Sequence, residues 1–440
     1  MKKGMARAAS AALALGLSAA LAACSGGGGG AGGGGGGGNE VKAGAYNGPK
    51  VTVLFWNGWT GGNGPQLVTK LVNEFNSSQK KITIKNVTMQ WGDIASKMPL
   101  AIKAGRGPDV TVEHGSDIST YAAQNLVLKA DAINKSLGYT EANFPKGLYK
   151  AGSYNGGQYA IPWSVTPLGL YTNLDVLKKA GITKVPTDKA GYEDALNKLK
   201  AKGVQGEWVD GYVFTGLFEF ESLLWQYGGE LYNGDVSKAT FNSDAGVKAL
   251  TWMRQHIDKG WSPGKVAPDA NINAVISGKT AFNWNGIWQT SNPALQKVKW
   301  TSSEVPQIGT QQAVWSSSTH WSFVNNKNQD KNKTQAAATF VKWMNDHSLD
   351  WAASGELPAA NKVRESSQLT SKYPNYKPFL KELSYAHFET AAPGIANADA
   401  TIQTAVNEAL LGKKSVKQAL NDGAAKADKL LQQNKQQYGG

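Results

Sequence analysis

Apolar runs of two kinds alternate over the first part of the chain. Residues 51–56 are a continuous run of β-branched, aliphatic and aromatic side chains, which predicts a buried strand ending at the glycine-rich loop 57–64. Apolar residues then recur at every fourth position over 67–75, the spacing of one helix face. The order strand, helix, strand is predicted again at 82–84, 94–102 and 108–112. This alternation favours an α/β fold with a mainly parallel sheet, helices on both faces and ligand loops at the carboxyl ends of the strands.

The later part of the chain mixes extended and helical patterns. Two extended segments, 159–163 and 169–173, precede a helix predicted over 175–180. A second helix is predicted over 245–259, where the apolar residues share one face and a glycine follows. The last hundred residues are mostly helical in pattern, and the Ser-x-x-Gln capping box at 415–418 starts the final helix. The pattern favours two α/β lobes rather than a barrel.

The N-terminal segment has the pattern of an export signal. Basic residues precede an apolar stretch over 8–20 that is too short to span a bilayer, which predicts a signal peptide over 1–23. The sequence Leu-Ala-Ala-Cys at 21–24 resembles the lipobox of bacterial lipoproteins, in which Cys24 would become the first mature residue and carry a diacylglyceryl group. A glycine-rich linker, 24–49, would then tether the protein to the outer face of the cell membrane. Ordinary cleavage, with Cys24 an incidental thiol, is the alternative.

Composition excludes several other classes of protein. The chain has 46 basic and 33 acidic residues and a net charge of +13, but only four of the basic residues are arginines. Bidentate recognition of phosphates and bases relies on arginine, so we expect a lysine-coated surface and no nucleic-acid partner. The single cysteine excludes an intramolecular disulfide framework. The five histidines are not clustered, so we expect no metal site, and binding of an incidental calcium ion stays an alternative. We expect no cofactor.

Short motifs occur along the chain in a fixed order, at 56–59, 104–110, 159–162, 171–173, 226–231, 286–288 and 354–359. Over about residues 50–430 this ordered set resembles the family 1 extracellular solute-binding proteins, the sugar-binding lipoproteins of ABC importers related to maltose-binding protein. One departure is Thr172, where relatives usually carry a second tyrosine.

The resemblance implies a two-lobe, periplasmic-binding-protein-like (type II) fold with discontinuous lobes joined by a hinge. The first lobe would comprise 50–167 plus 320–355, and the second 168–315 plus 359–440. The chain would cross between the lobes near 167–171, 315–321 and 354–358.

Tryptophan is abundant, with 15 residues, and several stand where a strand gives way to a loop. A flat apolar ring beside hydrogen-bonding groups suits a sugar, whose C–H face stacks while its hydroxyls need donors and acceptors. The candidate stacking residues are Trp56, Trp59, Trp163, Trp284, Trp288 and Trp315. The candidate polar partners are Asn57, Glu113, His114, Asp117, Glu219, Asn285 and His320. Core packing is the alternative for each tryptophan, and a solvated surface or a helix cap is the alternative for each carboxylate.

The resemblance and the residue types together predict a monomeric carbohydrate-binding protein that delivers its ligand to ABC permease subunits by closing its lobes, without catalysis. One alternative is a phosphorylated polyol such as glycerol phosphate as ligand, which needs a cationic anchor. The other is an extracellular carbohydrate-cleaving enzyme. The G-x-S-x-G match at 260–264 does not support it, because a predicted helix, not a strand, precedes the serine. The sequence does not specify the sugar, its chain length or the permease.

Overall fold

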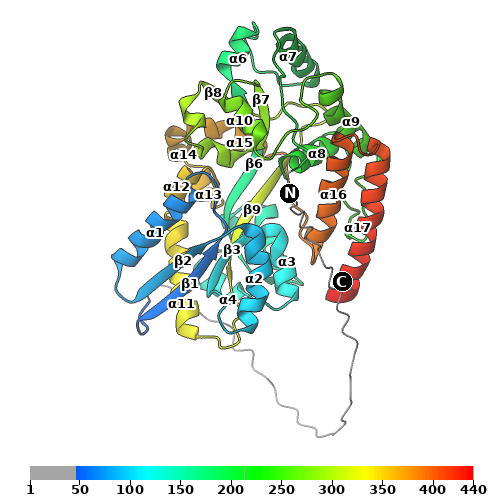
Figure 1. Cartoon of the computed structure of the whole chain (residues 1–440). Helices are drawn as coiled ribbons and strands as arrows, with labels where there is room; N and C mark the ends of the chain where they lie inside the picture. Colours follow the sequence, from blue (N-terminus) through cyan, green and yellow to red (C-terminus); the bar gives the residue numbers. More distant parts are fainter. Residues whose placement is uncertain (1–45, 213, 440) are drawn as a thin grey trace, which may run out of the picture. The chain divides into compact units, whose positions relative to one another are not determined.

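The computed structural model describes residues 46–212 and 214–439 (Figure 1). The predicted signal peptide, Cys24 and the linker up to residue 45 lie outside the described residues. Within the described ranges, no helix has both the length and the apolar character needed to cross a membrane.

The strands form one large sheet and one small hairpin. The large sheet has nine strands in the described residues, with the order β10-β6-β9-β3-β1-β2, and β7, β8 and β11 pair beside this path. The bounds are β1 Val51–Asn57, β2 Ile82–Thr88, β3 Val110–His114, β6 Ile161–Asn173, β7 Phe282–Gly286, β8 Trp300–Ser303, β9 Val314–Phe323, β10 Leu357–Pro358 and β11 Ala386–Phe388. The hairpin pairs β4 Ser153–Tyr154 with β5 Gly157–Gln158.

The expectation of a mainly parallel sheet is wrong. β1 pairs in parallel with both β2 and β3, as the strand–helix–strand order predicted, and β11 is parallel to β9. β9 lies antiparallel between β3 and β6, and β7, β8 and β10 are antiparallel to β6. The parallel group β2-β1-β3 therefore ends at β3. The strand next to β3 is β9, which comes 200 residues later in the chain and runs antiparallel to β3.

The two extended segments predicted at 159–163 and 169–173 belong to a single strand. β6 runs without interruption from Ile161 to Asn173, and every residue in it is buried. Its first half pairs with β9, with a register shift between Pro162 and Ser164, and its second half pairs with β7 and β8. β6 therefore contributes to two separate parts of the sheet.

Helices cover the sheet, and most follow the predicted apolar patterns. The longer ones are α1 Gly64–Ser78, α2 Trp91–Lys103, α3 Gly115–Ala123, α7 Lys189–Ala201, α8 Phe214–Gln226, α9 Asp244–Asp258, α11 Lys331–Asp346, α16 Ile395–Leu410 and α17 Val416–Tyr438. The shorter ones are α4 Asp131–Ser136, α5 Lys146–Ala151, α6 Leu174–Lys179, α10 Ala270–Ile276, α12 Ser348–Trp351, α13 Asn361–Arg364, α14 Ser367–Lys372 and α15 Lys377–Glu382. The Ser415 hydroxyl accepts a hydrogen bond from the Gln418 N–H, as the capping box predicted.

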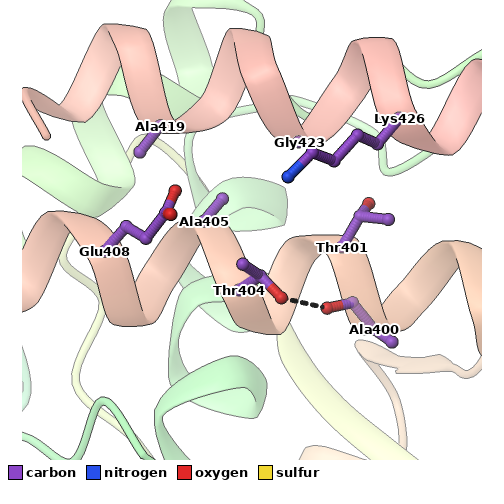
Figure 2. Close-up of a pocket in the computed structure, with 8 residues that line it drawn as sticks. All are labelled: Ala400, Thr401, Thr404, Ala405, Glu408, Ala419, Gly423 and Lys426. Carbon is purple, nitrogen blue, oxygen red and sulfur yellow. Dashed lines mark hydrogen bonds between the residues drawn. The ribbon is translucent and has the colours of Figure 1, made fainter. Parts of the chain in front are cut away.

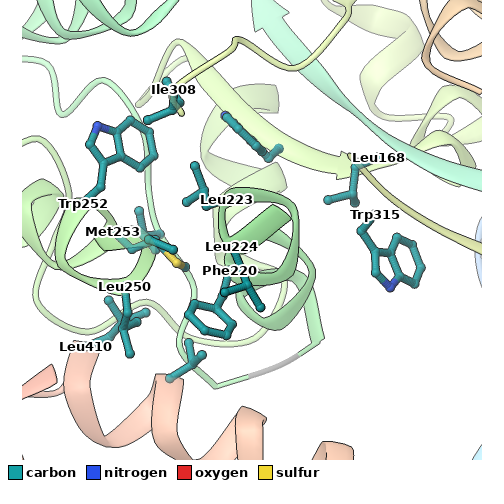
Figure 3. Packing of buried hydrophobic residues seen from close by; sticks show 14 of the residues in the cluster. Leu168, Phe220, Leu223, Leu224, Leu250, Trp252, Met253, Ile308, Trp315 and Leu410 are labelled. Carbon is teal, nitrogen blue, oxygen red and sulfur yellow. The ribbon is translucent and has the colours of Figure 1, made fainter. Parts of the chain in front are cut away.

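Buried apolar residues form two large clusters. In one, α8 packs against α9 and α16, and Figure 3 shows Phe220 and Leu224 of α8 close to Leu250 and Leu410. The other contains β1, β3, the first half of β6 and α11, and at its centre four indole rings lie within 6.3 Å of their neighbours, those of Trp59, Trp163, Trp321 and Trp351. Two separate cores agree with a two-lobe fold, while the residue boundaries given above for the lobes stay a prediction.

α16 and α17 pack closely along their small residues. A side chain at Gly423 would bring its Cβ within 3.2 Å of the Thr401 carbonyl oxygen, so glycine permits the close approach. A shallow hollow of about 170 Å³ remains between the helices (Figure 2). No aromatic side chain is among the described residues that line it. The described residues that line the hollow all belong to these two helices.

Candidate functional site

A cavity of about 440 Å³ lies between segments that belong to the two large clusters. One wall comes from the loop after β1, the start of α2 and the end of β3. The opposite wall comes from α8 and the segment after β7, and both β6 and β9 contribute residues between the walls. The volume falls in the range of small-molecule binding sites. The strands β1, β3 and β7 end at this cavity, which agrees with the expectation that ligand loops lie at strand ends.

Aromatic rings dominate the wall formed by α8 and the segment after β7. The Phe218 ring stacks on Trp315 with centroids 3.6 Å apart and an interplanar angle of 12°. Trp288 stands at 86° to Trp315 and at 65° to Phe214, with centroid distances of 6.5 and 6.2 Å. Trp288 is partly exposed, whereas Trp315 is only 2% exposed. Trp288 and Phe214 therefore offer ring surface that other side chains do not cover.

The facing wall contains a second group of rings. Trp91 of α2 lies 4.5 Å from the His114 ring, and Trp59 backs the loop after β1. A Cβ on Gly58 would lie 2.0 Å from the Trp91 ring, and one on Gly286 would lie 1.9 Å from the Trp288 ring. Glycine at these two positions lets each indole lie flat against the backbone, so both glycines shape the cavity.

Polar groups lie among the rings, and their protonation is set by burial. Glu389 accepts hydrogen bonds from the hydroxyls of Ser317 at 2.8 Å and Ser116 at 3.2 Å, yet burial raises its pKa to about 7. Burial likewise raises the pKa of Glu356, whose carboxylate accepts from the Trp351 indole at 2.9 Å. Burial lowers the pKa of His114, which favours the neutral form of the ring.

The cavity has no cationic side chain in its described lining, which contains neither lysine nor arginine. Its charged groups are carboxyls, and the nearby Asp117 also has its pKa raised by burial, to about 6. Among residues 46–212 and 214–439, the many lysines therefore do not line this site. The arrangement suits a ligand that offers apolar faces to the rings and hydroxyls or amines to the carboxyl and hydroxyl oxygens.

Four of the residues predicted from sequence line the cavity: Trp59, His114, Trp288 and Trp315. The structure brings them together from positions more than 250 residues apart in the chain. Trp56 lies outside the lining, partly buried against the small cluster of Ile94 and Met98, and Asp117 lies on α3 behind His114. These two are close to the site without forming its wall.

The remaining predicted residues are buried and do not line the cavity: Asn57, Glu113, Trp163, Glu219, Trp284, Asn285 and His320. Several already have partners in the protein. Asn57 accepts from the Trp59 N–H, Glu113 accepts from the Thr111 hydroxyl at 2.6 Å, and the His320 ring bonds the Ser318 hydroxyl at 2.9 Å. In this structure these side chains are packed or hydrogen-bonded inside the protein, next to the cavity but not in its wall.

Sequence reasoning missed several lining residues, among them Trp91, Phe214, Phe218, Glu356 and Glu389. Trp91 begins α2 at the end of the loop after β2, a position equivalent to that of Trp59 after β1, and this equivalence is a signal that could have identified it. Phe214 is 47% exposed, but a sequence pattern does not reveal which aromatic residues of a helix face solvent.

A cavity enclosed between two α/β cores, lined by rings and uncharged or acidic groups, defines a ligand-binding protein of the two-lobe class. The chain belongs to the bacterial extracellular solute-binding protein family, whose profile matches residues 70–378. The predicted family resemblance and fold class are thus confirmed.

Individual relatives are distant in sequence. The diacetylchitobiose binding protein of Streptomyces coelicolor is 25% identical over 268 residues, which are 58% of this chain and 61% of that protein. Among solved structures, the GacH receptor of Streptomyces glaucescens, studied unliganded and with acarbose, has a TM-score of 0.78 at 21% identity and covers 87% of this chain and 99% of the receptor. Maltose-bound MalE3 of T. maritima has a TM-score of 0.76 at 20% identity and covers 86% and 99%. At these identities the structures establish the fold.

Proposed function

We propose that the cavity binds a carbohydrate, as a sugar or an oligosaccharide. The observation that supports this most strongly is the lining itself, in which partly exposed rings stand beside carboxyl and hydroxyl oxygens. Sugars need both kinds of contact, because their C–H faces are apolar and their rims carry hydroxyls. The ligands named for the relatives, diacetylchitobiose, acarbose and maltose, support the same class.

A phosphorylated polyol is the less favoured ligand. A phosphate group needs a cationic or multiple N–H anchor, and the described lining of the cavity offers neither lysine nor arginine. The raised pKa of Glu389, to about 7, leaves a partly ionised carboxyl that would repel a phosphate. A neutral sugar meets neither problem.

The proposed role is capture and delivery. A ligand that contacts both walls stabilises the form in which the lobes are closed, and an ABC permease would recognise that form. The strands β6 and β9, which contribute to both sides, would bend as the hinge. No chemical step is needed, and the family and the structural relatives are binding proteins.

We also propose the lipid anchor at Cys24, with the protein acting as a monomer on the outer face of the cell membrane. The signal-peptide pattern over 1–23 and the glycine-rich linker that follows support the anchor. Cys24→Ser should release folded protein with unchanged ligand affinity into the medium. Retention of this variant in the membrane fraction would contradict the anchor.

The central test is calorimetric titration with a panel of neutral mono-, di- and oligosaccharides and with glycerol phosphate. We expect saturable binding of a carbohydrate, which is recovered intact after prolonged incubation. At 100 times its dissociation constant, that ligand should raise the free energy of unfolding by about 2.7 kcal/mol. Binding of glycerol phosphate alone would overturn the carbohydrate assignment, and shortened oligosaccharide products would reveal an enzyme.

A further inference from the structure

A second, smaller chamber adjoins the cavity. It has a volume of about 300 Å³ and shares Phe218 and Glu389 with the lining of the main cavity. The rest of its wall comes from α8, from Leu231 between α8 and α9, from the segment after β11 and from α16. Because Phe218 and Glu389 line both spaces, the side chamber lies next to the main cavity.

Three carboxyls from three different segments line the side chamber: Glu221 of α8, Glu389 after β11 and Asp399 of α16. Asp399 accepts a hydrogen bond from the Tyr232 hydroxyl at 2.5 Å, and Glu389 accepts from two serine hydroxyls through one oxygen. Glu221 differs from both. It is only 4% exposed, and no hydrogen bond or ion pair links its carboxyl to another residue in the described part of the chain.

No positive side chain compensates this acidic group. Neither lysine nor arginine is among the described residues that line the chamber, and no ion pair reaches any of the three carboxyls within the described ranges. Burial and mutual repulsion raise the pKa of Glu221, and burial raises the pKa values of Glu389 and Asp399 to about 7 each. The hydrogen bond from the Tyr232 hydroxyl lowers the pKa of Asp399, while repulsion from Glu389 and from Asp117 of α3 raises it. Buried carboxyls without a compensating positive charge are unfavourable, and a bound positive charge would stabilise them.

The nature of that charge follows from the geometry. Within the described residues, no group of three acidic, histidine or cysteine side chains is arranged to hold a metal ion. A protonated amine makes weaker demands, because its three N–H donors can reach carboxyl oxygens that are not focused on one point. Leu217, Leu231 and the Phe218 ring complete the wall and suit the carbon skeleton next to such an amine.

We propose that the side chamber binds a protonated amino group, so that the ligand of this protein is an amino sugar or an oligosaccharide that contains one. This inference rests on the proposed carbohydrate function and narrows it. Glu221 is the main partner of the amine, and Glu389 and Asp399 supply further acceptors. The opposing hypothesis is that the three carboxyls bind neutral sugar hydroxyls only.

The test compares matched sugars that differ at one group. Calorimetric titrations would use glucose, galactose and mannose beside their 2-amino and 2-acetamido forms, and the β-1,4-linked di- and trisaccharides of glucose, glucosamine and N-acetylglucosamine. We expect at least one amino form to bind about tenfold or more tightly than both of its neutral counterparts. Binding of the amino form should also release protons, measured as a dependence of the heat on the buffer, because the amine favours the ionised carboxyls.

Variants locate the effect. Glu221→Gln should reduce the preference for the amine over its neutral counterpart to about threefold or less. Asp399→Asn keeps an acceptor for the Tyr232 hydroxyl and should also reduce the preference for the amine. It replaces Glu221→Gln as the test variant if Glu221→Gln does not fold. Glu74→Gln removes the same charge from the exposed surface of α1 and should leave the preference unchanged.

The outcomes separate this inference from the proposed function. If neutral sugars bind and no amino form is preferred, the amine site is overturned and the carbohydrate function stands. An amine preference that survives in both chamber variants also overturns the assignment to this chamber. If no member of the panel binds, neutral or amino, both the inference and the carbohydrate assignment fail on this panel.

Discussion

Replacing Trp288 by alanine is the most direct test of the binding cavity. The side chain follows β7 in a short 3₁₀ turn, is partly exposed, and contacts Trp315 and Phe214 by ring edges. Gly286 and Gly355 leave room for it, since a Cβ on Gly355 would lie 2.8 Å from the Trp288 backbone. The residue is thus held in place by its neighbours and still presents ring surface to the cavity.

The expected magnitudes differ for binding and for folding. Stacking of a flat ligand ring on an aromatic side chain contributes about 1–3 kcal/mol, so Trp288→Ala should weaken binding roughly 5- to 150-fold. The loss of two edge contacts, at about 0.5–1.5 kcal/mol each, should lower the free energy of unfolding by about 1–3 kcal/mol. Trp163, with no exposed surface, is the matched control. Trp163→Ala should cost about 3–5 kcal/mol of stability, and any folded fraction should keep its affinity far better.

Both quantities are measured on the same samples. Urea unfolding without ligand gives the free energy of unfolding, and calorimetric titration with the sugar found in the panel gives the affinity. The reasoning is refuted if Trp288→Ala destabilises the protein as much as Trp163→Ala does and binds the sugar normally. Trp288 would then be a packing residue and the cavity wall would need another platform.

Three further outcomes are expected. If the ligand lacks net charge, its affinity should change less than about threefold between low and moderate salt, and a tenfold loss would indicate a charged ligand. Asp399→Asn should become more stable relative to wild type as pH rises from 4 to 8. The folded-state pKa of Asp399, about 7, lies above its unfolded value, so the stability that the protonated carboxyl contributes to the wild type is lost as pH rises through the folded-state pKa. The same difference in free energy of unfolding between variant and wild type at pH 4 and pH 8 would contradict this. Gly355→Ala should lower both stability and affinity, since Gly355 has φ +89° and adjoins the Trp288 backbone; unchanged melting and binding would show that the loop adapts freely.

Local patterns were sufficient to predict most of the elements around the parallel strands. The strand beginning at Val51 and the helix that buries Leu71 and Phe75 have the predicted type and nearly the predicted bounds, because each buries one regular face. The helix ends at Gly181 and Gly260 also agree, since both glycines have positive φ, as C-terminal caps require.

The antiparallel centre of the sheet could not be predicted from local pattern. β9 contains four consecutive small polar residues, 316–319, which in sequence resemble a loop. They form a strand because both faces of β9 are covered and its backbone is paired with β3 and β6. Such pairing joins residues more than 100 positions apart and leaves no periodic signal in the sequence.

The tryptophans show the same limit within the site. Trp59 and Trp288 lie in loops and line the cavity, whereas Trp284 lies inside β7 two residues after Phe282 and faces the same core. Trp284 is among the stacking residues predicted above, but its alternation with asparagines has the period of a strand, and the structure buries it. Loop tryptophans and strand tryptophans can thus be separated by period, while their distance from a cavity requires the folded chain.

The packing of α16 and α17 onto α8 and α9 also determines the order in which the molecule can assemble. This core is complete only when residues up to Leu431 have been added, because Leu410, Leu420 and Leu431 all belong to the cluster that contains α8 and α9. During synthesis from the N-terminus, the middle of the chain therefore remains without its final partners until nearly the last residue has been made. Contacts this distant in sequence also make folding slow. A chain that completes its core so late cannot reach its final packing before its C-terminal helix is available.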